Sequence, residues 1–502
     1  MNASVQRRMI YMALALLLPV MSTSCGGGLG TTAGGGTGGT GVGPVTGFGS
    51  VIVNGVKYDD TGIDNTNFFD DHGRNKSGLM AGMMVAISGT IGGANGTADN
   101  ITVLRHVDGP MDDNGVELAT NRLKVMGQDV VVDASTVFDN GITNLAGLRT
   151  LQGANVNHPE LEVHGSADNN GVIHATFIHK WSDDRIAGRD VQVRGAVAGL
   201  DTAAKTFSIG RKTVDYNALG SIPAGVIAGS FVEAKGTLRP SDNVLLAASV
   251  QLEDPTGGQP SGSRTEVEGY VNVVLTPNAS FELIGPNGIQ TVTWTGTTPI
   301  TGGTGADIRA GVKVEVEGTR KVGGALAATK IEIRRASNVR MESTATSVTA
   351  VSLTVFGKTV TVNALTQYED SRDDLNTFGQ LDIAVNDTLK ISAFLDNTTV
   401  PASIVATRVE RIDALLFNRR ILQGPVDSFP PGGPDLFILG INVLGGTASF
   451  LDADESAMTQ AQFFQLLADN KAAGQTTIVK ARGTDSNPMS ANEIQIEPTI
   501  DN

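Results

Sequence analysis

Histidines are the residues of this 502-residue chain best suited to chemistry, and they are unevenly placed. All six lie between residues 72 and 179, and four of them crowd into 22 residues: His158, His164, His174 and His179. With Glu160 or Glu162 they could hold zinc for a metal-assisted hydrolase, because imidazole and carboxylate groups are usual zinc ligands. Such a site needs at least three ligands, so His164 and His174 are weak candidates for metal binding.

The turn between His164 and His174 decides whether the two rings share a face of a hairpin. A two-residue loop at Asn169 and Asn170 places them on opposite faces, and a three-residue loop at 168–170 places them on the same face. Aligning residues 163–165 with the similar residues 316–318 favours the two-residue loop. We therefore expect solvent-facing imidazoles, no metal and no cofactor.

Clusters of acidic residues are a second candidate for metal chemistry, because carboxylates in loops can bind calcium. They are Asp59, Asp60 and Asp64, then Asp70 and Asp71, then Glu369, Asp370, Asp373 and Asp374, and finally Asp452, Asp454 and Glu455. None follows the D-x-[DN]-x-[DN]-G spacing of a calcium loop. We expect solvated turns.

The two tryptophans, Trp181 and Trp294, could stack on a sugar ring. Trp294 follows Val292 in a strand-like segment, where packing between structural units is an equally good explanation. A carbohydrate-binding module therefore stays open as an alternative function.

Motifs with a defined catalytic chemistry do not occur in the sequence. It has no G-x-S-x-G nucleophile elbow, no H-E-x-x-H and, with a single cysteine, no cysteine-based metal pair. Residues 352–359 resemble a phosphate loop, but Gly357 is better suited to a hairpin turn. We expect a protein that is not an enzyme.

The elements that position these residues recur six times from residue 43 onward. Each copy predicts one strand, then two strands joined by a glycine turn, as in Val51–Tyr58, then two alternating strands, as in Val312–Gly318 and Ala327–Ile333. Some copies hold a helical pattern between the third and fourth strands: Leu145, Leu148 and Leu151; Leu375 and Phe378; and, most clearly, Ala457, Ala461, Phe464 and Ala468.

Strands, a helix and two further strands are the order of a five-stranded Greek-key barrel of the OB type. We expect an all-β fold, a tandem array of about six small OB-like barrels, with a β-meander as the rival. The expected segments are a signal peptide at 1–24, a Gly-rich tether at 25–42, and repeats at 43–108, 109–186, 187–254, 264–336, 337–418 and 419–502. We expect these repeats to form an extended row of separate domains in sequence order. The linker at 254–264 is expected to be sensitive to proteolysis.

The stretch Gly-Phe-Gly-Ser-Val-Ile-Val-Asn-Gly-Val-Lys-Tyr-Asp at residues 47–59 resembles the bacterial lipoprotein repeat family of domain of unknown function 5666. Later copies keep the glycine and strand pattern and lose the Phe-Gly-Ser and Asn-Gly elements. The resemblance implies a repeat architecture and an envelope location. It implies no known activity and no catalytic residues.

The first 28 residues resemble a bacterial lipoprotein signal. Arg7 and Arg8 precede an apolar run of 13 residues, Met9–Met21, which is shorter than the roughly 20 residues that span a bilayer. Cys25 follows three small residues and, in such signals, becomes the lipidated first residue. Because Ser22 stands where leucine is usual, an ordinary secretory signal cut after Ser24 stays open. Twin-arginine export is a weaker alternative, since Arg7 and Arg8 are adjacent but Met9 and Ile10 only imperfectly match the apolar pair that normally follows.

The charge balance of 37 Lys and Arg against 52 Asp and Glu gives a net charge of −15 and argues against a nucleic-acid partner. Gly26 and Gly27 after the cysteine favour the outer membrane. We expect a non-catalytic, lipid-anchored envelope protein that presents its β domains as a binding or spacer surface. Its partners are the membrane, through the N-terminal lipid, and an envelope protein or glycan.

Overall fold

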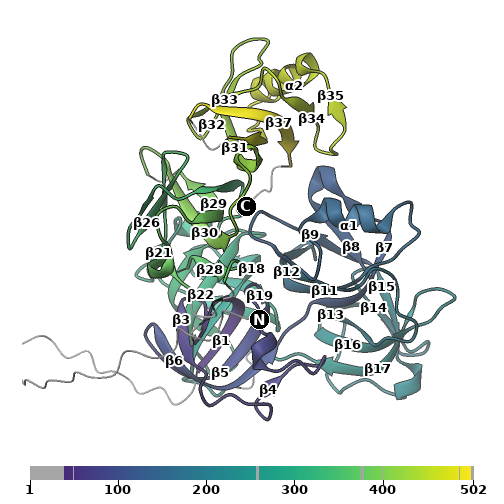
Figure 1. Cartoon of the computed structure of the whole chain (residues 1–502). Helices are drawn as coiled ribbons and strands as arrows, with labels where there is room; N and C mark the ends of the chain where they lie inside the picture. Colours follow the sequence, from purple (N-terminus) through teal and green to yellow (C-terminus); the bar gives the residue numbers. More distant parts are fainter. Residues whose placement is uncertain are drawn as a thin grey trace, which may run out of the picture. The chain divides into compact units, whose positions relative to one another are not determined.

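A computed structural model describes residues 39–48, 50–255, 259–363, 365–373, 375, 378–397, 399–484 and 487–498 (Figure 1). The expected signal peptide, Cys25 and most of the tether lie outside the described residues. So do residues 256–258 in the middle of the linker where early proteolysis is expected.

Closed five-stranded barrels are the building unit, and repeat 2 shows their strand order. Its strands are β7 (Val107–Glu117), β8 (Arg122–Val125), β9 (Gln128–Val131), β11 (Glu160–Ala167) and β12 (Ile173–Ser182). The ring runs β7-β8-β9-β12-β11 and returns to β7, with β9 and β12 parallel and the other pairs antiparallel. This is the OB-type Greek-key order, so the meander alternative is wrong.

The other five repeats have the same ring order. Their strands are listed here in chain order. Repeat 1 has β1 (Gly39–Gly47), β2 (Val51–Val53), β3 (Val56–Asp59), β5 (Met84–Gly92) and β6 (Asn95–Val103). Repeat 3 has β13 (Val191–Asp201), β14 (Thr206–Ile209), β15 (Lys212–Asp215), β16 (Phe231–Leu238) and β17 (Leu245–Leu252). Repeat 4 has β18 (Arg264–Thr276), β19 (Ser280–Gly285), β20 (Gly288–Thr293), β22 (Lys313–Arg320) and β23 (Leu326–Ile333). Repeat 5 has a first strand split into β24 (Val339–Thr344) and β25 (Ser347–Val348), then β26 (Ser352–Val355), β27 (Lys358–Thr361), β29 (Thr388–Asp396) and β30 (Ser403–Ile412). Repeat 6 has β31 (Arg420–Ser428), β32 (Leu436–Ile438), β33 (Ile441–Leu444), β36 (Ile478–Gly483) and β37 (Met489–Glu497).

Short extra strands follow the third ring strand in the chain. They are β4 (Phe68–Phe69), β10 (Val137–Asp139), β21 (Ile300–Thr301), β28 (Gln367–Asp370), β34 (Ser449–Leu451) and β35 (Ala457–Met458). Each pairs with the last strand of its repeat, except β35, which pairs with β34.

The hairpin turns explain why the glycine pattern recurs. In repeat 1, Asn54 and Gly55 link β2 to β3 with positive φ angles of 53° and 76°. A two-residue turn with both φ angles positive matches the twist of the strands it joins, which is why Asn-Gly is favoured there. Gly357 occupies the same place between β26 and β27 with a φ of 71°, so the resemblance to a phosphate loop is explained by a turn.

Helices occur where two of the three patterns predicted them. α1 (Leu145–Gln152) lies in repeat 2 and α2 (Gln460–Ala472) in repeat 6. The predicted face of α2 is wrong, because Phe463, Phe464 and Leu467 are buried whereas Ala461 and Ala468 are exposed. Large aromatic side chains fill the core better than the alanines that defined the pattern.

The third helical pattern, Leu375 and Phe378 in repeat 5, encloses residues 376–377, which lie outside the described residues, and a 3₁₀ turn, η5 (Gln380–Asp382), follows it. The other 3₁₀ turns are η1 (Lys76–Gly78), η2 (Leu118–Thr120), η3 (Asn217–Leu219), η4 (Gly305–Asp307) and η6 (Phe417–Arg419). Within the described part of the chain, no helix combines the length and apolar composition needed to cross a membrane.

The first strand of each repeat pairs with the first strand of another repeat and so joins two barrels. β7 pairs with β13, which joins repeats 2 and 3, and β24 pairs with β31, which joins repeats 5 and 6. β1 pairs in parallel with β18, which joins repeats 1 and 4. The prediction of a row in which each repeat contacts only its neighbours in sequence is therefore wrong, because repeats 1 and 4 are joined.

The pairing of β1 with β18 also explains why β1 begins inside the segment that composition assigned to the tether. Gly39 and Gly41 lie in β1, and a Cβ atom on Gly41 would lie 2.3 Å from the hydroxyl oxygen of Tyr58. Only glycine allows this close approach of the strand to a buried ring.

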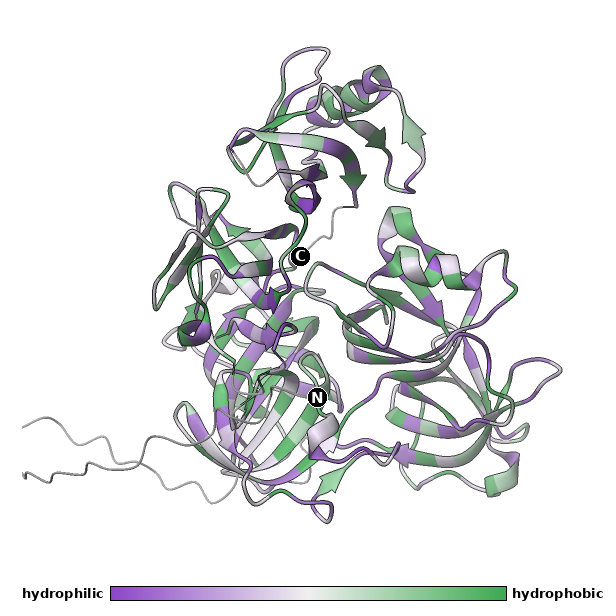
Figure 2. Cartoon of the chain, viewed as in Figure 1, coloured by the Kyte–Doolittle hydropathy of each residue, from purple (hydrophilic) through white to green (hydrophobic). Residues whose placement is uncertain are grey.

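The cores follow the period-two alternation of the strands, and green hydrophobic positions recur along the barrels in Figure 2. One hydrophobic cluster spans repeats 2 and 3 and another spans repeats 5 and 6. Trp294 is buried in a hydrophobic cluster with Phe281 and Leu283 of repeat 4, to which Val42 and Met84 of repeat 1 also belong, so its ring is not available to a sugar.

Candidate functional site

His164 is fully buried at a contact between repeats 1 and 2. Its Nδ1 accepts a hydrogen bond from the backbone N–H of Met84 in β5 at 3.1 Å, and its Nε2 lies 2.6 Å from Oε1 of Glu162. Because Nδ1 accepts, the proton is on Nε2 and the ring is neutral. Burial lowers the pKa of His164, which agrees with this assignment.

His174 contacts a different repeat. Its ring stacks on Tyr270 of β18 in repeat 4 with a centroid distance of 4.3 Å, and its Nε2 lies 3.3 Å from Oδ2 of Asp168. The two weak candidates for metal ligands therefore interact with different repeats, and each has a carboxylate partner of its own.

The expectation that His164 and His174 lie on opposite faces is wrong. Val163 and Ile173, their chain neighbours, point into the core of repeat 2, so both histidines project from the outside of that barrel. Asp168 and Val172 are hydrogen-bonded across the turn, which leaves a three-residue loop at Asn169–Gly171 that neither alternative placed there. A β-bulge at 164–165 shifts the register further.

The remaining histidines are not solvent-facing either, which corrects a further expectation. His106 is buried, and burial together with the charge of Arg194 lowers its pKa to about 4. His72, His158 and His179 are half-buried. Their carboxylate partners are Asp108 at 2.5 Å, Asp113 at 3.6 Å and Asp139 at 2.6 Å, respectively.

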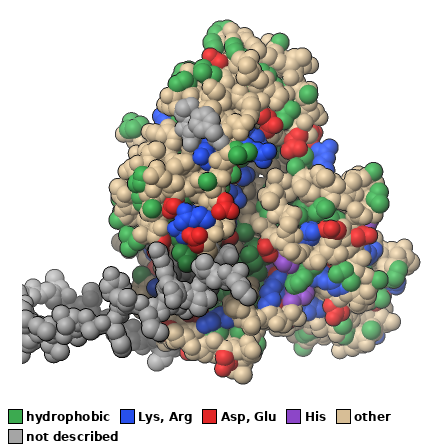
Figure 3. Space-filling model, in the orientation of Figure 1, with side chains coloured by type: hydrophobic (Ala, Val, Ile, Leu, Met, Phe, Trp, Pro, Cys, Tyr) green, Lys and Arg blue, Asp and Glu red, His purple; other side chains and the backbone are tan. Residues whose placement is uncertain are grey.

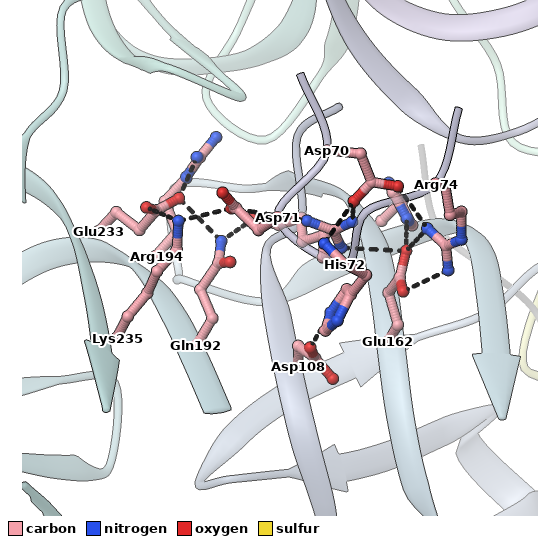
Figure 4. Close-up of polar contacts among 12 residues, drawn as sticks. Asp70, Asp71, His72, Arg74, Asp108, Glu162, Gln192, Arg194, Glu233 and Lys235 are labelled. Atoms are coloured by element: carbon pink, nitrogen blue, oxygen red, sulfur yellow. Dashed lines mark hydrogen bonds and ion pairs between the residues drawn. The ribbon is translucent and has the colours of Figure 1, made fainter. Parts of the chain in front are cut away.

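An ion-pair network, which we call the Arg105 network, contacts His164 through Glu162, and Figure 4 labels its members Asp70, Asp71, Arg74 and Glu162. It consists of Asp70, Asp71, Arg74, Arg105 and Glu162. The guanidinium of Arg105, fully buried, pairs with Asp70 and lies 3.2 Å from Oε1 of Glu162 and 3.6 Å from Asp71. Arg74 adds two parallel hydrogen bonds of 2.8 and 2.6 Å to the oxygens of Glu162, a bidentate pair.

Glu162 stays ionised within this network. Burial alone would raise its pKa, but the hydrogen bonds from His164 and Arg74 and the positive charge of Arg105 outweigh burial and hold the pKa well below its usual range. An ionised Glu162 with these contacts joins β11 of repeat 2 to residues of repeat 1.

The network continues to repeat 3, as the left half of Figure 4 shows. Lys235 of β16 lies 2.5 Å from Asp71 and 2.6 Å from Glu233. Arg194 of β13 pairs with Glu233, which also accepts a hydrogen bond of 2.9 Å from Gln192. The charged cluster therefore joins repeats 1, 2 and 3.

Trp181, the other candidate for sugar stacking, lies against side chains of the protein itself. The guanidinium carbons of Arg74 and Arg189 lie 4.9 and 5.5 Å from its ring centroid, in cation–π positions. The rings of His72 and His179 lie 4.8 and 4.5 Å away. These contacts occupy the aromatic surface on which a sugar would stack.

Two of the acidic clusters are ion-paired rather than solvated turns. Asp70 belongs to the Arg105 network, and Asp370 makes bonds of 2.8 and 2.5 Å to Arg411 in repeat 5. In the part of the chain that the structure describes, no group of three or more His, Cys, Asp or Glu side chains could hold a metal ion. On the face seen in Figure 3, basic side chains lie beside acidic ones.

Sequence reasoning missed Arg74, Arg105 and Arg189, the cations that interact with the predicted histidines and acids. Arg105 lies just after the last strand of repeat 1, in a segment that links it to repeat 2. An arginine in such a linker carries no periodic signal, and it becomes buried only because three repeats meet around it. Cys25, the predicted lipidation site, lies outside the described residues.

Comparison with models of protein families gives a match over four segments of the chain. The model of a domain of unknown function, DUF5666, matches residues 109–179, 194–251, 263–332 and 344–410, slightly more than half of the chain. These matches fall on repeats 2 to 5, whereas the motif that resembles the family lies at residues 47–59 of repeat 1. Among curated proteins none matches.

Among solved structures, three chains match. The one titled "drosophila Unr CSD456" is 14% identical, with 46% of this chain and 100% of that chain covered and a TM-score of 0.11. Similarity at that level carries no argument about this chain.

Proposed function

The chain belongs to the DUF5666 family, and from this premise we propose that it is a non-catalytic lipoprotein of the bacterial outer membrane that presents tandem β-barrels as a binding or spacer surface. Cys25 carries the lipid, residues 26–38 form the tether, and the described barrels contact an envelope protein or glycan. Nucleic acid is not a partner, because the net charge is −15.

The observation that supports a non-catalytic role is how His164 and Glu162 use their polar atoms. Both nitrogens of His164 have partners, and both oxygens of Glu162 accept hydrogen bonds from Arg74. Both belong to the set that the hydrolase alternative would use, the His158–His179 cluster with Glu160 or Glu162, and their partners lie in repeat 1 or within the same network. Their chemistry therefore serves to join repeats.

A lipid-labelling experiment tests the anchor. Cells that produce the full chain are grown with a labelled fatty acid, and Cys25→Ser is compared with Ser24→Ala, which keeps the cysteine. We expect label and membrane fractionation for the natural chain and for Ser24→Ala, and no label for Cys25→Ser. Equal labelling of Cys25→Ser would show that the anchor assignment is wrong.

A further inference from the structure

The described chain enters β1 at one end of a four-stranded part of the sheet. Gly39, the first residue of β1, pairs with Gly89 of β5 on one side and with Arg264 of β18 on the other, and Arg264 pairs with Thr319 of β22. β5 and β22 run antiparallel to β1 and β18, so both continue past this row of residues and turn back beyond it. The hairpins β5–β6 and β22–β23 therefore project from the same end of the sheet, where β1 begins.

The tips of these two hairpins, residues 90–95 and 320–325, form what we call the entry edge. Val322 is its most exposed large hydrophobic side chain, with an exposed fraction of 90%. Two backbone hydrogen bonds within residues 321–325, of 2.8 and 3.1 Å, close the turn that holds Val322 at the tip. A single exposed valine is ordinary on a protein surface, so the residues around Val322 and its place in the chain decide what it means.

Basic residues lie beside Val322, although the chain as a whole is acidic. Arg320 and Lys321 immediately precede it, and neither residues 319–326 nor residues 88–97, which contain the two tips, include an acidic residue. The full chain has a net charge of −15, so two cations without a carboxylate in these segments are a local departure from its average. An exposed apolar side chain beside cations is suited to the interface of a membrane with anionic lipids.

The length of chain before β1 keeps the entry edge near Cys25. The thirteen residues 26–38 separate Cys25 from Gly39, and that number of residues spans at most about 50 Å when fully extended. A covalent link of this length raises the effective concentration of the edge at the membrane that holds the lipid. Contacts that are individually weak are therefore enough to hold the edge there.

We propose that the entry edge rests on the head groups of the membrane in which the lipid of Cys25 is inserted. Val322 enters the interface, and Arg320 and Lys321 lie beside lipid phosphates. The proposal rests on the proposed function for the lipid anchor and adds a second contact, made by the protein itself. This contact sets which end of β1 faces the bilayer.

Fluorescence from a dye at the tip of the β22–β23 hairpin tests the proposal on the full lipidated chain. Cys25 is the only cysteine, so a chain whose Cys25 sulfur carries the lipid has no free thiol, and Val322→Cys supplies one for an environment-sensitive dye. The matched control is Val400→Cys. Val400 is 98% exposed in the equivalent hairpin of repeat 5, between β29 and β30, and residues 397–402 of that hairpin include no basic residue. Both labelled chains are reconstituted into vesicles of phosphatidylethanolamine and phosphatidylglycerol that contain some lipid with a nitroxide on its head group.

We expect emission at shorter wavelength and quenching by the nitroxide for the dye on Val322→Cys, and neither for the dye on Val400→Cys. One basic side chain near an anionic surface favours contact about fivefold. Adding Lys321→Gln to Val322→Cys is therefore expected to lower the ratio of docked to undocked chains by about that factor. Lys471→Gln, at an exposed lysine of repeat 6, leaves the ratio unchanged.

Equal quenching at the two dye positions, or none on Val322→Cys, would overturn the proposal. So would a wavelength shift that is already present in detergent and grows with protein concentration, because it indicates contact with a second copy of the chain. Uptake of dye by the natural chain before reconstitution would show that Cys25 has a free thiol, which would overturn the anchor and this proposal with it. Because that measurement precedes the vesicle experiment, failure of the anchor and failure of the membrane contact are distinguishable.

Discussion

Glu266 in β18 is a carboxylate whose replacement by glutamine is expected to stabilise the protein. Its side chain is 2% exposed, it lies opposite Glu317 of β22, and through the parallel pair it lies opposite Gly41 of β1. Arg264 is its cationic partner among the described residues and is shared with Glu317, at distances of 2.9 Å to Glu266 and 2.8 Å to Glu317. The second oxygen of Glu266 has no hydrogen-bond partner.

The loss of stability caused by ionised Glu266 follows from the shift of its pKa on folding. Burial is the main cause and raises the pKa of Glu266 to about 8 from 4.5; Arg264 opposes the rise and the charges of Glu315 and Glu317 add to it. A group that binds its proton more tightly in the folded state loses stability as pH rises from the unfolded pKa toward the folded one. At 1.36 kcal/mol per pKa unit, the cost is about 1 kcal/mol at pH 5, about 3 at pH 7 and about 5 at pH 9.

Hydrogen exchange of the backbone amides of β1 and β18 at pH 5, 7 and 9 measures this cost where the two repeats meet, once the intrinsic exchange rates are corrected for pH. Glu266→Gln keeps the shape and cannot ionise, so we expect stronger protection than in the natural chain, by an amount that grows with pH. Glu282→Gln in β19 is the control, because Glu282 bonds to Asn272 within the same repeat. A difference that is constant with pH, or weaker protection at pH 9, would refute the reasoning.

Two further predictions concern the Arg105 network and zinc. Arg105→Met removes the fully buried one of the two cations that pair with both Asp70 and Glu162 and leaves them only Arg74 within the described network, so we expect a loss of about 3 kcal/mol in unfolding free energy by urea titration. Arg211→Met, at an exposed pair with Asp129, costs less than about 1 kcal/mol, and equal losses would contradict the importance of burial. Elemental analysis of the purified full chain is expected to find less than one zinc per chain, and one tightly held zinc that is lost in His164→Ala would instead favour the hydrolase.

The strands were predictable because period-two alternation and a glycine turn reflect local chemistry. Val51–Tyr58 and Val312–Gly318 alternate between core and surface, and the structure confirms strands at both. The recurrence of this pattern was enough to predict the barrels. The β-bulge at 164–165 was not predicted: the extra residue in β12 shifts the alternation of that strand by one position, and the adjacent apolar residues Phe177 and Ile178 are compatible with either register.

The candidate site was predicted by residue type and not by role. His164 and Glu162 were identified as possible ligands, but the sequence could not show that Met84 and Arg74, about 80 residues away or more, would use their polar atoms. The outward positions of a strand have the same sequence pattern whether their side chains face water or contact another repeat. The cations of the Arg105 network therefore became visible only when the repeats were seen together.

The parallel pair of β1 and β18 has a consequence for the order in which the protein can fold. Gly39 pairs with Arg264, about 225 residues further along the chain, so this contact cannot form until repeats 2, 3 and the start of repeat 4 have been synthesised. During that interval the backbone groups of residues 39–42 in β1 that face β18 lack their native partners. An unpaired strand edge can form hydrogen bonds with a strand of another chain. The first repeat to leave the ribosome is thus among the last to be completed, and nascent chains shorter than about 264 residues are the species in which intermolecular strand pairing should begin.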